Sequence, residues 1–118
     1  MKTFVNCAAQ GDLLIRRIES IPANAEPVKS EHGQFILAHS ETGHNHVVAD
    51  RPCVKVYADP NNPFVAYLEV IQNEEAWDVV LEHLRTYHQH ESIKIEPGNY
   101  EIRRQREYSP EGWRRVQD

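Results

Sequence analysis

Short stretches of apolar residues, separated by turn residues at short intervals, cover most of this chain. Runs of about four to eight β-branched and aromatic residues bounded by Gly, Pro, Asn or Asp are typical of β-strands. The pattern predicts strands at 13–18, 34–39, 44–49, 54–57, 64–70, 93–95 and 100–108. Residues 22–33 and the cluster Asp59–Pro63 are predicted loops, because they concentrate proline and other turn-forming residues.

One segment departs from this strand-like pattern. Asn73 is a favourable N-cap, and glutamates follow it in the first turn, where carboxylates suit the helix dipole. Apolar side chains then recur at helical spacing, at Trp77, Val80, Leu81 and Leu84. We therefore predict one α-helix over about residues 74–87.

Many short strands with a single helix predict a mainly β fold, namely a small antiparallel β-barrel or sandwich with one peripheral helix. A parallel sheet is disfavoured, because parallel neighbours need crossover helices between them. A length of 118 residues predicts a single domain over residues 1–118, with a core that needs neither disulfides nor metal.

Composition narrows the classes of function. The net charge of −5 disfavours broad, non-specific binding to nucleic acid or to an anionic membrane. We expect a cytoplasmic protein without membrane association, because the chain lacks both a secretory apolar segment and a run long enough to span a bilayer. Cys7 and Cys53 lack the spacing of metal or redox motifs and are expected to be free thiols.

The candidate chemistry concentrates in residues 39–46, where three histidines and Glu41 surround a Thr-Gly turn. If the turn holds an even number of residues, His39 falls on the same face of the hairpin as His44 and His46. Phe35 and Leu37 would share that face and make it internal. An odd turn would break the arrangement, since a shift of one residue turns a strand over.

Converging imidazoles predict a site for a divalent transition metal, with His39, His44, His46 and His90 as candidate ligands. His88 is an alternative to His90. Glu41 is the candidate catalytic group, either as a base or as a further ligand. The alternative is structural: the histidines line a turn, bond to backbone groups and bind nothing.

The last predicted strand carries the second candidate site. Arg104, Arg106 and Tyr108 alternate on one face, after Tyr100 and Ile102. Guanidinium groups recognise carboxylates and phosphates, which predicts a small anionic ligand. Aromatic residues beside arginines also suit single-stranded nucleic acid. The alternative is that the strand leaves the core and its arginines pair with nearby glutamates at the surface.

The His-x-His pair followed by a Pro-Gly turn at Pro97 and Gly98 resembles the cupins, small β-barrels that bind a metal through two such histidines, a carboxylate and a later histidine. Two departures are visible. Asp50 stands three residues after His46, where that family has Glu, and no histidine follows Pro97.

The chain also resembles small uncharacterised bacterial and phage proteins, to which no activity is attached. The resemblance rests on three segments, which are Gln-Gly-Asp at residues 10–12, Leu-Ala-His-x-Glu-Thr-Gly-His-x-His at 37–46, and Pro-Gly-x-Tyr with Gln-Arg-Glu-Tyr at 97–108.

Two hypotheses follow. In the first, the histidine hairpin forms a metal or ligand site, and arginines of the last strand hold an anionic ligand. In the second, the chain is a non-enzymatic binding or assembly module, in the manner of a phage protein, that docks through residues 100–108. A homo-oligomer is compatible with either hypothesis, because short β chains pair through sheet edges.

Overall fold

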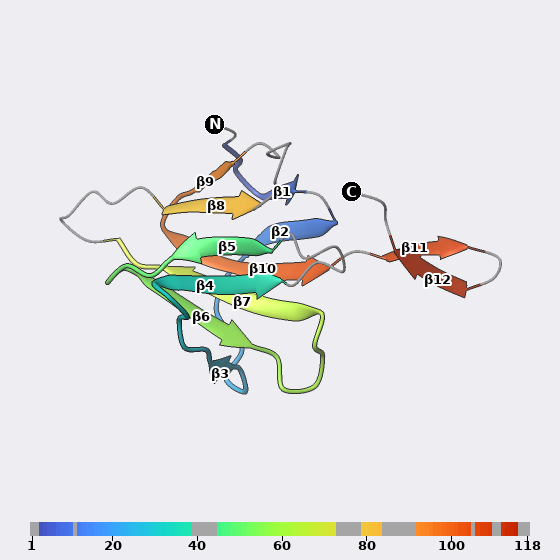
Figure 1. Ribbon diagram of the computed structural model, residues 1–118, viewed down its shortest axis with the longest axis horizontal. Coiled ribbons are helices and arrows are strands. Elements are labelled where there is room, and N and C mark those ends of the chain that lie inside the picture. The colour runs from blue at the N-terminus through green and yellow to red at the C-terminus, as the bar shows by residue number, and fades with distance from the viewer. Residues whose placement is uncertain are drawn as a thin grey trace.

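The computed structural model describes residues 3–10, 12–38, 45–72, 79–83, 92–104, 106–109 and 112–115. These residues form a mainly β structure with two antiparallel sheets and a separate two-stranded hairpin (Figure 1). Among them no helix is long and apolar enough to cross a membrane.

The larger sheet has six strands, and every hydrogen-bonded pair within it is antiparallel. In spatial order it contains β1 (Cys7–Gln10), β2 (Leu13–Ile18), β10 (Gly98–Arg104), β7 (Val65–Val70), β6 (Val54–Ala58) and β3 (Glu26–Pro27). The central strand β10 comes from the C-terminal part of the sequence, so this sheet forms only when distant segments meet.

The smaller sheet has four strands, in the order β4 (Gln34–Ala38), β5 (His46–Ala49), β8 (Val79–His83) and β9 (Ile93–Ile95). Phe35 pairs with Val48 in this sheet. The register then shifts between Ile36 and Ala38, so that Ala38, not Leu37, is the partner of His46. The irregularity lies at the start of the segment that contains the histidines.

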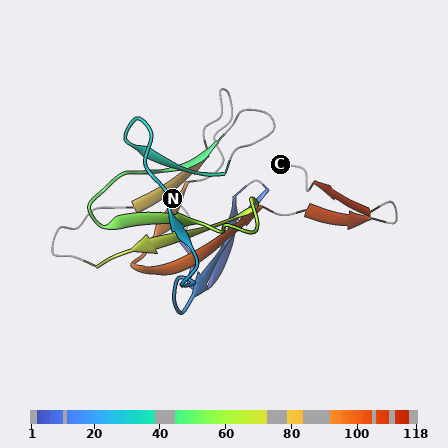
Figure 2. The same cartoon turned by 90° about the horizontal axis from the view of Figure 1, so that it is seen from below.

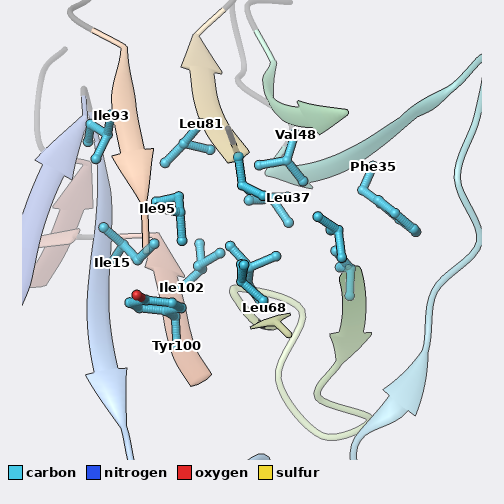
Figure 3. Packing of buried hydrophobic residues seen from close by; sticks show 14 of the residues in the cluster. Ile15, Phe35, Leu37, Val48, Leu68, Leu81, Ile93, Ile95, Tyr100 and Ile102 are labelled. Carbon is cyan, nitrogen blue, oxygen red and sulfur yellow. The ribbon is translucent and has the colours of Figure 1, made fainter. Parts of the chain in front are cut away.

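The two sheets face each other across a single hydrophobic core (Figure 3). Alternate residues of each strand point inward, as the period of two requires. Leu68, Tyr100 and Ile102 of the larger sheet are at most 1% exposed, and so are Leu81 and Ile93 of the smaller one. The burial of these side chains is the main stabilising contribution to the fold.

The predicted helix at 74–87 is wrong where the structure describes it, because residues 79–83 form strand β8. Val79 and Leu81 are buried and Val80 is less so, which is the alternation of a strand. β5 and β9 each offer a strand edge to this segment, and pairing with both overrides its helical spacing. Trp77, Leu84 and the N-cap Asn73 lie outside the described residues.

Of the two predicted arrangements, a β-barrel or a sandwich, the barrel is also wrong. A barrel requires each strand to pair on both sides. In the described part of the chain the larger sheet ends at β1 and β3, and the smaller sheet ends at β4 and β9. The strands divide between two open sheets, and their common core replaces barrel closure.

The predicted strand at 100–108 is divided in two. β10 ends at Arg104, and β11 (Arg106–Ser109) begins a hairpin with β12 (Gly112–Arg115). This hairpin forms a sheet of its own and lies to one side of the two larger sheets (Figures 1 and 2).

Candidate functional site

His46 is the only residue of the predicted metal set that the structure describes. His39, Glu41, His44 and His90 lie outside the described residues, and so does His88. The metal and catalytic assignments of these residues therefore stay predictions. The described residues contain no group of three or more His, Cys, Asp or Glu side chains arranged to hold a metal ion.

His46 is completely buried and lies between two polar side chains of the β1–β2 hairpin. Its Nδ1 is 2.9 Å from Oε1 of Gln10. Since an amide oxygen only accepts, Nδ1 carries a proton and donates it. Its Nε2 is 3.4 Å from Oδ1 of Asp12. Both ring nitrogens therefore face protein oxygens.

Gln10 fixes the imidazole from the other sheet. Its Nε2 donates to the backbone oxygen of Leu81 at 3.0 Å, which leaves Oε1 directed at His46. Gln10 is 3% exposed, and its hydrogen bonds join β1 of the larger sheet to β5 and β8 of the smaller one. Because buried polar groups must be hydrogen-bonded, these contacts set the relative position of the two sheets at this end.

Asp12 joins the histidine to the predicted arginine. Its carboxylate is buried, with Oδ2 3.7 Å from Nε of Arg104 and Oδ1 facing His46. The guanidinium carbon of Arg104 lies 5.9 Å from the centroid of the Phe64 ring, a cation–π contact. The structure thus brings together His46 and Arg104, one residue from each predicted site. We call Gln10, Asp12, His46 and Arg104 the polar cluster.

The backbone explains why these four side chains meet. Gln10 pairs with Leu13, so the β1–β2 connection places Asp12 at the end of the hairpin. Leu13 also pairs with Arg104, the last residue of β10. Tyr100 and Ile102 are core residues, and Arg104 continues their face where the core ends. The predicted change from apolar residues to arginine on this face is confirmed as far as Arg104.

A pocket of about 320 Å³ lies between the sheets, beside the polar cluster. Arg104 lines it together with mostly apolar residues, which are Val28, Ile36, Leu37, Ala38, Val56, Ala58, Pro63, Phe64, Val65 and Ala66. Asn62 and Asp59 also line the pocket.

The carboxylate of Asp59 is engaged elsewhere. It accepts from the backbone N–H of Asn61 at 2.8 Å and from the hydroxyl of Tyr67 at 3.4 Å. Burial, and then the charge of Asp59, raise the pKa of the Tyr67 hydroxyl above its ordinary value. Arg104 is the other charged side chain in the described lining of the pocket.

Of Arg106 and Tyr108 the structure gives the backbone position. Both belong to β11, which pairs with β12 instead of with either large sheet. Sequence reasoning missed Gln10 and Asp12 as site residues and noted them only as part of a shared pattern. The available signal was the alternation along β1, in which the polar Gln10 takes the core-facing position two residues after the buried Ala8.

No curated protein and no solved structure matched the chain. One family model did match, over residues 9–105, and this range contains the whole polar cluster. Since the match covers well over half of the sequence, the chain belongs to the family described as a domain of unknown function, DUF8820.

Proposed function

We propose that this chain is a binding domain for a small anionic ligand with an apolar body, held in the pocket with Arg104 as its anchor. The proposal rests on one observation: Arg104 belongs both to the buried polar cluster and to the lining of the pocket. Asp12 lies beside the guanidinium group at 3.7 Å, and the same arginine side chain lines the pocket.

Arg104 is well suited to this role because it is pre-oriented. Asp12 and the ring of Phe64 limit the conformations of the side chain, which is 15% exposed. A guanidinium has five N–H donors in a planar fork that matches carboxylate and phosphate oxygens. An ordered fork loses less entropy on binding than a free surface arginine does.

The charge of the polar cluster favours an anion when His46 is protonated. Nδ1 donates to Gln10, and a second proton on Nε2 would face the carboxylate of Asp12 at 3.4 Å. In that form Asp12 lies between two cations, and the cluster has a net positive charge. The opening between the sheets then attracts anions even though the whole chain carries a charge of −5.

The volume and the lining of the pocket determine the size and the apolar character of the ligand body. Its volume is near the lower end of the range for small-molecule sites, about 300 to 1,000 Å³. Its aliphatic and aromatic lining suits a short branched or aromatic group. The proposed activity is binding and not catalysis, because the imidazole is completely buried and both of its nitrogens face protein groups.

Calorimetric titration with matched probes tests the proposal. Isovalerate and benzoate are compared with their neutral amides, which have the same shape but no charge. We expect each acid to bind about tenfold or more tightly than its amide, as a charge-assisted hydrogen bond implies. Equal affinity of acid and amide, or no binding of any probe, would contradict the proposal.

Neighbouring residues supply matched variants. Arg104→Gln should abolish the preference for the acid, whereas Arg103→Gln should preserve it, because Arg103 is 49% exposed and contacts Glu101. Ala66→Leu fills part of the pocket without changing a charge, so it should weaken acid and amide alike. If Arg103→Gln reduced binding as much as Arg104→Gln, general surface charge would explain the result.

A further inference from the structure

Strand β4 is the edge of the smaller sheet, and its open side borders the pocket. Among the described strands it pairs with β5 alone, so no strand lies along its other side. Three consecutive residues of β4, Ile36, Leu37 and Ala38, line the pocket. A ligand in the pocket therefore lies beside an open backbone edge.

Hydrogen bonds at the start of β4 show which backbone groups face this edge. The N–H of Gln34 donates to Glu31 at 3.0 Å and its C=O accepts from Glu31 at 2.7 Å, so both groups point away from β5. In an antiparallel pair, residues that bond to the partner strand alternate with residues that do not. Because the register is regular from Gln34 to Ile36, the N–H and C=O of Ile36 also point to the open edge.

These two groups of Ile36 are available to a ligand. No described residue hydrogen-bonds to them on the open side, and Ile36 is partly exposed. Unpaired groups of an edge strand are the positions at which an extended peptide adds a further strand to a sheet. Ile36 thus offers one donor and one acceptor beside the pocket.

We propose that the ligand of this pocket is the C-terminal end of a peptide whose last residue is apolar, such as valine. The inference rests on the proposed function, because it uses the same pocket and the same arginine. The last backbone N–H of the peptide donates to the C=O of Ile36, and the N–H of Ile36 donates to an oxygen of the peptide. The terminal carboxylate binds Arg104, and the last side chain occupies the pocket.

The lining of the pocket matches each of the three groups that a terminal residue presents. Arg104 suits the carboxylate, aliphatic residues such as Val56 and Val65 suit a branched side chain, and the edge at Ile36 suits an amide. A simple carboxylic acid would leave the edge unpaired, and an internal peptide segment lacks the terminal carboxylate. A peptide end uses all three.

Calorimetric titration of the full chain compares N-acetyl-Ala-Ala-Val with isovalerate. Isovalerate has the carbon skeleton of valine without its amide nitrogen, so the peptide adds only the backbone that the edge would bind. We expect the peptide to bind about tenfold or more tightly. Equal affinities would overturn the inference and leave the proposed function standing, whereas no binding of either probe would contradict both.

Two isomeric peptides test the edge contact on the unaltered chain. N-methylation of the last amide removes the donor to Ile36, whereas N-methylation of the preceding amide does not, because successive N–H groups of an extended chain point in opposite directions. The first peptide should lose about tenfold in affinity, and the second should lose less than about threefold. Equal losses for the two isomers would overturn the pairing with β4.

The terminal carboxylate is tested with the C-terminal amide of the same peptide. On the original chain the amide should bind about tenfold or more weakly than the acid, and on Arg104→Gln the two should bind alike. Equal binding of acid and amide to the original chain would indicate recognition of an internal segment and would overturn the assignment of a peptide end.

A pair of variants tests the edge from the side of the protein. Ile36→Pro removes the N–H without breaking a bond to β5, because that group points outward and proline is tolerated at such edge positions. The preference for the peptide over isovalerate should fall about fivefold in this variant and persist in Ile36→Val, which keeps the N–H. Urea unfolding verifies that both variants fold. A folded proline variant with the full preference would overturn the role of this N–H, and the methylated peptides decide the same point if the proline variant does not fold.

Discussion

His46 is the residue on which the buried polar cluster depends. It makes contacts with Gln10 and Asp12 from a position with no solvent exposure. An imidazole in such a place stabilises the fold only while its partners are present, because each polar atom has lost its water.

His46→Leu should therefore lower the free energy of unfolding by roughly 3 kcal/mol, since it removes the imidazole from a buried carboxylate and a buried amide. Urea denaturation of the variant measures this loss. The control is Arg16→Leu, which breaks the 3.4 Å contact with Glu101 at a position 57% exposed. That change should cost less than about 1 kcal/mol. Equal losses in the two variants would mean that the buried contacts of His46 stabilise the fold no more than the exposed contact of Arg16 does.

At the scale of elements, β8 shows how pairing overrides local preference. Val80, Leu81 and Leu84 have helical spacing, but Val79 and Leu81 also have strand spacing. A sequence pattern alone leaves both periods open in so short a segment. The edges of β5 and β9 select the strand, because each supplies backbone hydrogen-bond partners.

Leu81→Ala tests this strand directly. Leu81 is fully buried in the core, so the substitution should cost about 2–5 kcal/mol. Val80→Ala, at the less buried neighbouring position, should cost less than about 1.5 kcal/mol. Thermal or urea unfolding distinguishes the two. A helix with Val80 and Leu81 on one buried face would instead give large losses for both.

The β11–β12 hairpin is predicted to be dispensable for the main fold. It shares no sheet with the other strands that the structure describes, so a chain ending at Gln105 should change the free energy of unfolding by less than about 1 kcal/mol. The far-ultraviolet circular dichroism per residue and the cooperativity of urea unfolding check this. Loss of cooperative unfolding in the shortened chain would mean that the hairpin supports the core.

At the scale of the whole molecule, three tyrosines link stability to alkaline pH. Tyr57, Tyr67 and Tyr100 each have a pKa above the ordinary value of 10.0, and burial is the largest cause in every case. The folded protein therefore holds these protons more tightly than the unfolded chain does. Their stabilising contribution is complete below pH 10 and is lost as pH rises through the higher folded-state pKa values.

Stability should thus decline above pH 10, and Tyr100→Phe should make the decline less steep. At neutral pH this variant loses the 2.6 Å hydrogen bond to the backbone oxygen of Glu96, worth about 1 kcal/mol. Urea denaturation across the alkaline range, together with tyrosinate absorbance, provides the measurement. An unchanged slope in the variant would contradict a raised pKa for Tyr100.

Much of the strand content follows from local pattern. The predicted strand at 13–18 coincides with β2, the one at 93–95 coincides with β9, and β6 and β7 begin within one residue of prediction. The strand β1 was missed, because Cys-Ala-Ala-Gln has weak β propensity and gains its place by pairing with β2.

Local sequence pattern is enough to predict the alternation of buried and exposed residues, and with it a mainly β chain. It also predicts that the last core-facing strand turns from apolar residues to Arg104. This information is local, because neighbouring residues on a strand point to opposite faces. Long-range pairing makes β8 a strand and divides the strands into two open sheets. The same long-range arrangement brings Gln10 and Asp12 to His46 and Arg104. These outcomes depend on pairings between segments far apart in the chain, whose free energies no short stretch of sequence contains.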